Sequence, residues 1–184
     1  MRTFISLLRG INIGGHHLIP MPALRTLYES LGMTDVTTYI QSGNVVFRTD
    51  RIDRSSLELL LEEEIARALG FPVAVIVRTP LQLSAIIRAC PYAGRAGIDT
   101  KRLAVAFLKS KPSAMRIRAL RALTAKGLDE YTITGRALYM HCPQGFAKTM
   151  LTNAFLEKHL LVKVTARNWK TTVTLLEMCR TLSS

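Results

Sequence analysis

The chain has 184 residues, 48% of them hydrophobic, enough for one domain with a sizeable core or for two small domains. No apolar run approaches the roughly 18 residues of a membrane helix, and the apolar stretch that ends at Arg9 is too short for a signal-peptide core, so no membrane partner is expected. The three cysteines are odd in number, lie far apart and form no CxxC pair. This pattern favours a reduced, cytoplasmic protein.

The net charge of +12 is distributed unevenly along the chain. Residues 1–79 contain eight Lys and Arg and eight Asp and Glu, whereas residues 80–184 contain seventeen basic and five acidic residues. The excess positive charge therefore lies entirely in the second part. Such asymmetry is compatible with a polyanionic partner, and equally with a basic surface supplied by an arginine-rich genome.

The first part of the chain predicts the element order β-α-β-β-α-β from its alternation of strand-like and helix-like apolar spacing. Ser42-Gly43 is predicted to form a hairpin turn, and a capping box of Ser55 and Glu58 is predicted to open the second helix. In chain order the predicted elements are the strand Phe4–Leu8, a helix over 22–31, the strands Val36–Gln41 and Asn44–Arg48, a helix over 55–69 and the strand Pro72–Arg78.

A helix that starts at Thr79-Pro80 and a loop over 91–100 follow, and the same order then recurs. We therefore predict an α/β (α+β) protein of two ferredoxin-like β-α-β-β-α-β sandwiches in tandem, with a C-terminal helix. The predicted domains are residues 1–79, a connecting helix and loop over 80–100, and a strongly basic second subdomain over 101–184. In chain order the second set comprises the strand Leu103–Leu108, the helix Ser113–Ala125, the strands Tyr131–Thr134 and Ala137–Cys142, the helix Phe146–Leu160, the strand Val162–Ala166 and a last helix capped by Asn168.

The glycine-rich segment LRGINIGGHH follows the first predicted strand and is a candidate phosphate loop. Gly10 and Gly15 have the spacing of a Walker A loop, but His16 and His17 stand where its lysine and hydroxyl are required. Asn12 stands where the dinucleotide-binding pattern requires its second glycine. An anion-holding backbone nest and a plain connection that uses glycine for positive φ both remain open. No nearby Asp, Glu or Cys completes a metal site with the two histidines.

Topology predicts that this segment meets a second polar loop. The first and third strands of a β-α-β-β-α-β unit are central antiparallel neighbours, so the loop over 9–17 should meet QSGN at 41–44. Two polar loops at one end of a sheet can form the rim of a ligand pocket. The residues QSGN are equally typical of a tight turn that has no ligand. The predicted ligand-binding residues of this first pocket are Arg9, Asn12, Gly14, Gly15, Gln41, Ser42 and Asn44.

The second part of the chain contains a candidate anion site. A Gly-x-x-Lys-Thr fragment is predicted to begin a helix, where free N–H groups and the helix dipole favour an anion. The strands that precede this fragment and Asn168 run in the same direction, so both segments should lie at one end of the sheet. Trp169 either stacks on a base or anchors the last helix in the core. The predicted anion-binding residues of this second pocket are Gly145, Lys148, Thr149, Arg167, Asn168, Trp169 and Lys170.

Four segments, RGINIGG, IPM, YIQSGNVVF and TARNWKT, occur in an order and spacing that resemble a known family. The chain resembles the bacterial family catalogued as domain of unknown function 1697 (DUF1697), from Arg9 to about Val173. The resemblance implies two ferredoxin-like subdomains, and it implies no established activity, substrate or catalytic residue. A lysine commonly follows the double glycine in this family, and its replacement by His16 disfavours a lysine-dependent phosphate site.

Three classes of function remain open. The favoured one is a cytosolic binding protein for a phosphate-bearing ligand, either a nucleic acid or a phosphorylated small molecule such as a nucleotide. A small-molecule enzyme of unknown reaction would use the two pockets, with Cys142 as a candidate nucleophile. A structural protein would form homo-oligomers through its edge strands. The sequence assigns no catalytic residue, cofactor or metal ligand.

Overall fold

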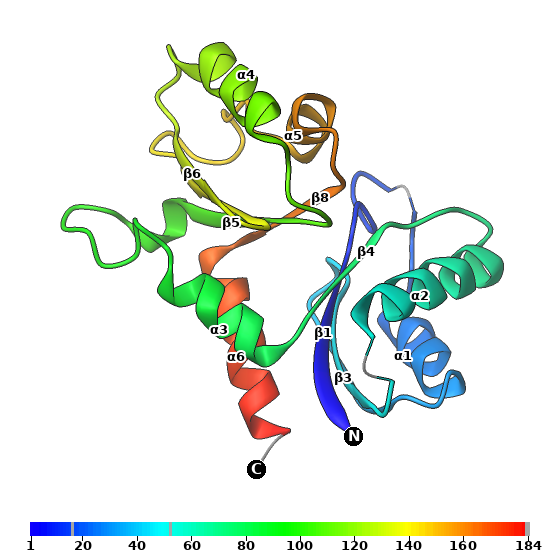
Figure 1. Cartoon of the computed structure of the whole chain (residues 1–184). Helices are drawn as coiled ribbons and strands as arrows, with labels where there is room; N and C mark the ends of the chain where they lie inside the picture. The colour runs from blue at the N-terminus through cyan, green and yellow to red at the C-terminus, as the bar shows by residue number, and fades with distance from the viewer. Residues whose placement is uncertain (16, 52, 183–184) are drawn as a thin grey trace. The chain divides into compact units, whose positions relative to one another are not determined.

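The computed structural model describes residues 1–15, 17–51 and 53–182, and the chain divides into two compact units (Figure 1). Unit 1 comprises Met1–Ala85 and Thr174–Ser184, and unit 2 comprises Ile86–Val173. Helices α3 (Pro80–Arg88) and α6 (Trp169–Thr181) contribute residues to both units. The described residues form two four-stranded antiparallel sheets and six α-helices, which confirms a mixed α/β protein. The domain bounds expected at residues 79 and 100 stay a prediction.

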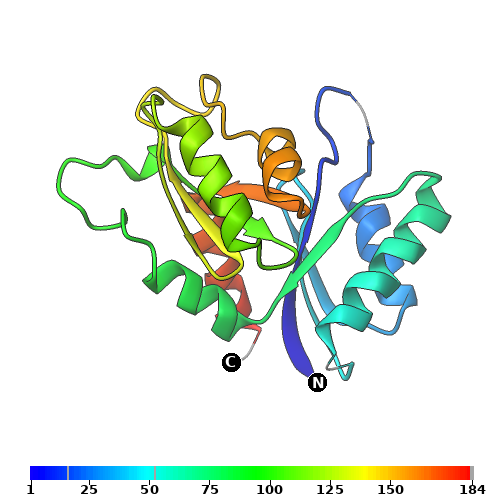
Figure 2. The same ribbon diagram turned by 45° about the horizontal axis from the view of Figure 1, so that its top comes forward.

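Unit 1 contains a sheet with the strand order β2-β3-β1-β4, and two helices cover one face of it (Figures 1 and 2). The antiparallel register pairs Phe4 with Phe47 and Ile5 with Arg78, so β1 is central. The predicted hairpin is confirmed. The elements are β1 (Arg2–Leu8), α1 (Met21–Ser30), β2 (Thr34–Tyr39), β3 (Asn44–Thr49), α2 (Arg54–Leu69) and β4 (Val75–Arg78).

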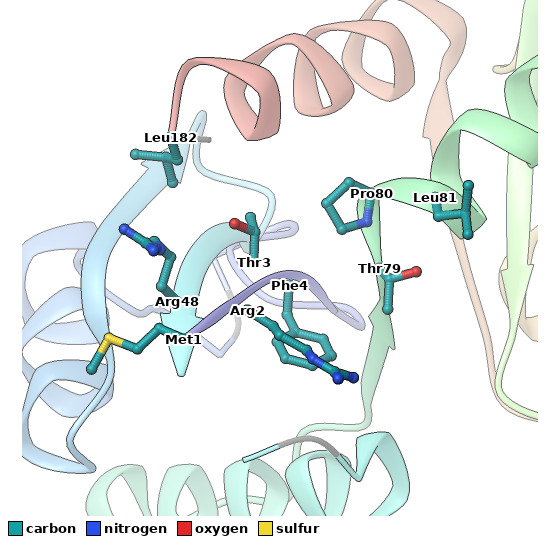
Figure 3. Close-up of a pocket in the computed structure, with 9 residues that line it drawn as sticks. All are labelled: Met1, Arg2, Thr3, Phe4, Arg48, Thr79, Pro80, Leu81 and Leu182. Carbon is teal, nitrogen blue, oxygen red and sulfur yellow. The ribbon is translucent and has the colours of Figure 1, made fainter. Parts of the chain in front are cut away.

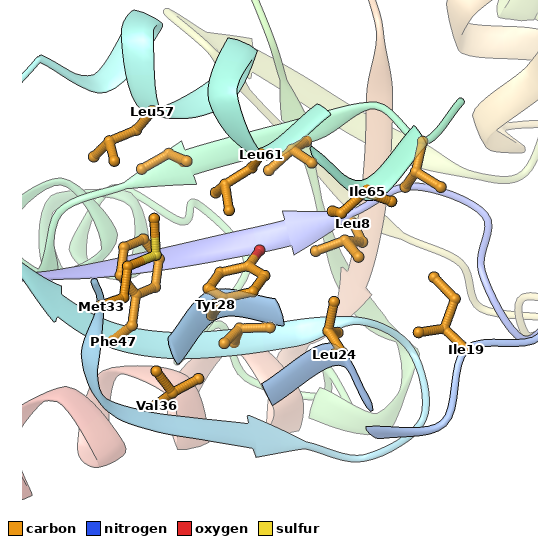
Figure 4. Close-up of a cluster of buried hydrophobic side chains, with 14 of the residues drawn as sticks. Leu8, Ile19, Leu24, Tyr28, Met33, Val36, Phe47, Leu57, Leu61 and Ile65 are labelled. Atoms are coloured by element: carbon orange, nitrogen blue, oxygen red, sulfur yellow. The ribbon is translucent and has the colours of Figure 1, made fainter. Parts of the chain in front are cut away.

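The core of unit 1 lies between its sheet and helices α1 and α2 (Figure 4). Apolar residues at helical spacing point from both helices onto the sheet. Tyr28 is fully buried, and its hydroxyl forms a hydrogen bond of 2.8 Å with Ser6 Oγ, so the one polar atom that it brings into the core has a partner. The central side chains are Leu24 and Tyr28 of α1, Leu57, Leu61 and Ile65 of α2, and Leu8 and Phe47 of the strands.

The predicted capping box of Ser55 and Glu58 is wrong. Helix α2 is capped by Asp53, whose Oδ2 accepts a hydrogen bond from the N–H of Ser56 at 2.6 Å. Glu58 is buried, and its Oε1 accepts from the N–H of Val77 in β4 at 2.8 Å. Glu58 therefore satisfies a strand N–H on the outer side of β4, a long-range role that a local capping pattern does not reveal.

Unit 2 repeats the order of unit 1, with a sheet of strand order β6-β7-β5-β8 and helices α4 and α5 over one face (Figure 2). Leu120 of α4 and Leu156 and Leu160 of α5 pack in its core against Ala104, Ala106 and Leu138. The elements are a 3₁₀ turn over Thr100–Arg102, β5 (Leu103–Leu108), α4 (Ala114–Thr124), β6 (Glu130–Thr134), β7 (Ala137–His141), α5 (Asn153–Leu160) and β8 (Val164–Asn168).

The predicted helix Phe146–Leu160 is wrong in its first half, because α5 begins only at Asn153. Thr152 caps it, and its Oγ1 accepts from the N–H of Phe155 at 3.2 Å. The hydroxyl of Thr149 donates to Asp129 Oδ2 at 2.5 Å and accepts from the N–H of Leu151 at 3.0 Å. These hydrogen bonds from the Thr149 side chain stabilise turns in the segment before α5. They offer the backbone an alternative to helical hydrogen bonds in that segment.

The two units share hydrogen bonds at matching positions. The first residue of each fourth strand donates its N–H to a glutamate of the preceding helix, Val75 to Glu62 at 2.8 Å and Val164 to Glu157 at 3.0 Å. The ends of the central strands also match. In unit 1, Leu8 N–H bonds to Gly43 O and Arg9 N–H to Ala74 O; in unit 2, Leu108 N–H bonds to Arg136 O and Lys109 N–H to Lys163 O.

Each fourth strand also carries a buried arginine beside the helix that follows it. Arg78 pairs with Ile5 and Arg167 with Val105, and each Nη1 donates to the carbonyl of the residue before it. Burial lowers the pKa of Arg167 to about 10, so this guanidinium remains charged at neutral pH. The repeated arginine is therefore part of the architecture of both units.

Candidate functional site

The two polar loops of the first predicted pocket meet, as the topology predicts. Asn12 Nδ2 donates to the carbonyl of Gln41 at 2.8 Å, and the N–H of Leu8 donates to the carbonyl of Gly43 at 2.8 Å. The loop after β1 and the hairpin between β2 and β3 therefore lie together at one end of the sheet of unit 1.

Asn12 holds this arrangement together. Its backbone has φ 54°, its N–H bonds to the carbonyl of His17, and its side-chain oxygen accepts from the N–H of Ile19 at 2.8 Å. Its side-chain nitrogen donates to the carbonyls of Ile19 and Gln41. Both donors and the acceptor of the amide are thus bonded within unit 1, which makes Asn12 a clamp of the loop.

Gly43 of the QSGN turn is required by close packing. It is buried with φ 71°, and a Cβ placed on it would stand 2.7 Å from Leu8 Cβ and 2.8 Å from Ile11 Cδ1. Asn44 is also buried, and its Nδ2 donates to Ser42 Oγ and to the carbonyl of Tyr39. Much of the QSGN sequence is therefore explained by the turn and its contact with the neighbouring loop.

The other residues of the first pocket differ in exposure. Gly14, Gly15 and Gln41 are exposed and Arg9 is half-buried, so these four remain accessible to a ligand. His16 lies outside the described residues, and the ring of His17 stacks on Phe71 with centroids 4.4 Å apart. Among the described residues, no cluster of three His, Cys, Asp or Glu side chains is placed to share a metal ion.

The segments of the second predicted pocket lie at the same end of the sheet of unit 2. His141, the last residue of β7, pairs with Leu103, and Asn168, the last residue of β8, pairs with Ala104. The two segments leave the sheet on either side of β5. Their common direction agrees with the sequence-based expectation, whereas the helix expected after Gly145 is absent there.

Three of the predicted anion-binding residues have structural partners. Thr149 binds Asp129, the Oδ1 of Asn168 accepts from the N–H of Thr171, and Arg167 is buried with its Nη1 2.7 Å from Thr165 Oγ1. Gly145 is buried and Trp169 half-buried, whereas the side chains of Lys148 and Lys170 are exposed. Lys148 and Lys170 are therefore the two cations of this set that face solvent.

Arg102 is a residue of this region that the sequence analysis did not single out. Gly145 has φ 90°, and a Cβ there would overlap with the Arg102 guanidinium, which lies against the turn. The N–H of Cys142 bonds to the carbonyl of Arg102 at 2.9 Å, which continues the pairing of β5 with β7. The pairing of β5 with β7 brings Arg102 close to Gly145. The sequence pattern of residues 145–149 alone does not reveal this neighbour.

Cys142 is unsuited to nucleophilic chemistry. It is fully buried in unit 2, and burial raises the pKa of its thiol to about 11. The reactive thiolate is therefore scarce at neutral pH. The neighbouring His141 has Nδ1 3.1 Å from Glu130 Oε1, and Arg95 binds the other oxygen of this carboxylate at 2.9 Å. Hydrogen bonds from His141 and Arg95 lower the pKa of Glu130 and so favour its ionised form.

The excess positive charge of the protein belongs to unit 2. Unit 2 contains sixteen Lys and Arg against four Asp and Glu, a net charge of +12, whereas unit 1 contains nine of each and is neutral. Among the helices of unit 2 the one acidic residue is Glu157, which is directed at the N–H of Val164. Glu157 is therefore turned toward the sheet.

We define the basic helix surface as the cations on and beside α4 and α5. Helices α4 and α5 pack side by side (Figure 2). Within residues 86–173 the structure gives none of these side chains an ion pair with a carboxylate. Most of them are exposed. The basic helix surface comprises Lys111, Arg116, Arg118, Arg121, Lys126, Lys158 and Lys163.

Comparisons with known proteins support the fold and the family. A solved structure described as conserved bacterial protein SP0830 from Streptococcus pneumoniae has a TM-score of 0.72 and 20% sequence identity, over 96% of this chain and 98% of that chain. No curated protein matches the chain. No helix among residues 1–15, 17–51 and 53–182 is long and apolar enough to cross a membrane. The sequence model described as "Protein of unknown function (DUF1697)" matches residues 1–139, and the chain therefore belongs to this family.

Proposed function

We propose that unit 2 binds the phosphate backbone of a nucleic acid through the basic helix surface. The observation that carries this proposal is the accumulation of unpaired cations on α4, with Arg116, Arg118 and Arg121 within one helix of eleven residues. Residues 100–128 contain no Asp or Glu. Such a surface attracts polyanions, and its guanidinium groups suit bidentate contacts with phosphate oxygens.

The strand order and the connections of each unit support the finer proposal of two ferredoxin-like sandwiches in tandem. Some folds of this topology bind RNA on the open face of the sheet through exposed aromatic residues. That mode does not suit unit 2, because Tyr139 on β7 is 1% exposed and its hydroxyl donates to the carbonyl of Ile86 at 2.9 Å. The helix face is therefore the better candidate.

The second pocket is proposed as a further contact for phosphate groups. Lys148 and Lys170 are exposed, and the Arg102 guanidinium lies against Gly145. The first pocket, with its accessible Arg9, Gly14, Gly15 and Gln41, is proposed as a separate small-ligand site. The basic helix surface and the two pockets have no residue in common, so variants can separate the three sites.

The test measures binding of a fluorescent 30-nucleotide single-stranded RNA and of duplex DNA by anisotropy at low salt. The triple variant Arg118→Gln, Arg121→Gln and Lys126→Gln removes three exposed cations of unit 2. The matched control Arg25→Gln, Arg51→Gln and Arg67→Gln removes three exposed cations of unit 1. We expect the first triple variant to lose at least about tenfold in affinity and the control to lose less than about twofold.

Two further arms separate the sites. The pair Lys148→Gln and Lys170→Gln should weaken binding less than the triple variant of Arg118, Arg121 and Lys126 does if the helices provide the main surface. ATP is the probe for a nucleotide ligand, and tight ATP binding that resists salt would replace the nucleic-acid proposal with a nucleotide site. Equal losses in the two triple variants, or no binding of either nucleic acid, would refute binding by the basic helix surface.

A further inference from the structure

A hollow of about 500 Å³ lies beside the start of β1 in unit 1 (Figure 3). Its walls come from the first residues of β1, from Arg48 of β3, from the start of α3 and from Leu182 at the end of α6. The volume falls within the range of small-molecule sites. No sequence motif marks this region, because its walls come from four separate segments of the chain.

The hollow exists because β1 extends beyond β4. Strand β1 pairs with β4 only from Ile5 to Leu8, whereas it pairs with β3 from Arg2. Continued past Ile5 and Arg78, the register would place Thr3 opposite Pro80, which has no N–H to donate. The chain instead enters α3 at Pro80, and the edge of β1 beside Thr3 stays open.

The open edge directs backbone groups of Thr3 into this space. The N–H of Leu8 bonds on the β3 side and the N–H of Arg9 on the opposite side, so odd-numbered residues of β1 direct their polar groups away from β3. Ile5 and Leu7 have partners there in β4, whereas Thr3 has no partner in that ladder. Among the described residues no group accepts a hydrogen bond from the N–H of Thr3, so this donor is available to a ligand.

The lining of the hollow is cationic and apolar. No Asp or Glu is among its walls, and Arg2 is exposed with no ion pair to the described residues. The other cations have carboxylate partners: Arg48 lies 3.4 Å from Asp35, and the N-terminal ammonium of Met1 lies 2.9 Å from Asp50. The two arginines extend in different directions (Figure 3). Arg2 is therefore the guanidinium that remains for a ligand.

Thr79 adds a second side-chain donor. Its Oγ1 accepts from the N–H of Gln82 at 3.2 Å, which leaves the hydroxyl proton for another acceptor. The same continued register places Thr79 opposite Phe4, on the face of the sheet that Arg2 and Phe4 share. Apolar surface is supplied nearby by Pro80 and by Leu81, which is 74% exposed.

We propose that this hollow binds a small amphipathic anion, with a carboxylate or phosphate monoester head and a short apolar part. The head accepts hydrogen bonds from the Arg2 guanidinium, the Thr79 hydroxyl and the Thr3 N–H. The apolar part lies against Pro80 and Leu81. This site is in unit 1 and is independent of the nucleic-acid surface proposed for unit 2.

Calorimetry with four probes tests the chemistry of this site. Hexyl phosphate and hexanoate have both an anionic head and an apolar chain, inorganic phosphate has only the head, and hexanol has the chain without the charge. We expect the better of the two amphipathic anions to bind at least about tenfold more tightly than inorganic phosphate or hexanol. Comparison of hexyl phosphate with hexanoate identifies the head group. Equal binding of hexanol and the anions would overturn the proposal, because the charge would then contribute nothing.

Matched variants locate the site. Arg2→Gln should weaken the preferred anion at least about tenfold, whereas Arg25→Gln, an equal change of charge on α1, should not. Leu81→Asn should weaken the amphipathic anion without weakening inorganic phosphate, and Leu59→Asn, the same change at another exposed leucine, on α2, should change neither. The triple variant of Arg118, Arg121 and Lys126 should bind the anion as tightly as the wild type does. Unchanged binding in Arg2→Gln would overturn the assignment, as would failure of both anions to bind the wild-type protein.

Discussion

Units 1 and 2 share one strand order and several matching hydrogen bonds, yet they differ in charge. Helix α2 of unit 1 carries four glutamates, whereas α4 of unit 2 carries three arginines and no acidic residue. A glutamate bonded to the fourth strand and a buried arginine at its end occur in both units. Features common to both units are explained by the fold, and features present in one unit are the better candidates for function.

The loops after the central strands also differ between the two units. In unit 1 residues 9–20 separate β1 from α1, whereas in unit 2 residues 109–113 separate β5 from α4. The longer loop needs Asn12 to hold it and Gly43 to let it approach the hairpin. The glycine-rich motif of unit 1 thus serves a loop that unit 2 does not possess.

The largest effect on stability should come from Gly43→Ala. The added Cβ meets Leu8 and Ile11, and φ is 71°, so we expect a loss of about 3 kcal/mol in the free energy of unfolding. In Gly135→Ala, the turn glycine of unit 2, the new Cβ meets nothing within 4 Å and the loss should be about 1 kcal/mol. Urea denaturation measures both, and equal losses would contradict the close approach of the loops in unit 1.

The shared glutamates should be of similar importance in the two units. Glu62→Ala and Glu157→Ala each remove an acceptor from the first N–H of a fourth strand, and each should cost about 2 kcal/mol. Glu63→Ala, at an exposed position of α2, should change stability by less than about 0.5 kcal/mol. A large loss in one unit with none in the other would show that these bonds are not equivalent.

A smaller effect tests where α5 begins. Thr152→Ala removes the N-cap and should cost about 1 kcal/mol, similar to Ser113→Ala at the start of α4. If the helix began at Phe146, as the sequence predicts, Thr152 would be an interior position where alanine is neutral or stabilising. Thermal unfolding of the two variants distinguishes these starts.

The smallest effect concerns the buried thiols, one in each unit. Burial raises the pKa of Cys142 from 9.0 to about 11 and that of Cys179 to about 12. Because the folded-state pKa values are raised, the contribution of these neutral thiols to stability is fully present below pH 9 and is lost as the pH rises through about 11 and 12. At pH 8 the half-buried Cys90 should react first with a thiol reagent, and the other two only after unfolding in urea. Rapid reaction of all three thiols with the reagent in the folded protein would contradict the burial of Cys142 and Cys179.

The fold was largely predictable from the sequence, because turn residues and apolar spacing carry local information. The hairpin at Ser42-Gly43 follows from turn chemistry, and β5 was predicted with its observed bounds, Leu103–Leu108. The start of α5 was not predictable, because the bond from Thr149 to Asp129 joins residues twenty positions apart in sequence. The roles of Glu58 and Arg102 depend in the same way on neighbours that only the folded chain brings together.

The candidate sites were less predictable than the fold. Sequence reasoning placed the right loops together, but it did not show that the Asn12 amide and the Thr149 hydroxyl are bonded within the protein. The hollow beside Thr3 arises because β1 extends beyond the end of β4, and no sequence motif indicates this difference in strand length. The location of the charge, in contrast, was visible from the positions of the charged residues along the sequence.

The salt dependence of RNA binding most directly tests whether the charge difference between the units serves binding. Each phosphate contact contributes about 0.7 to the slope of log K against log salt for a single strand. Loss of Arg118, Arg121 and Lys126 should therefore reduce the slope by about 2, whereas loss of Arg25, Arg51 and Arg67 should leave it unchanged. Equal slopes in the two variants would contradict a binding surface on unit 2.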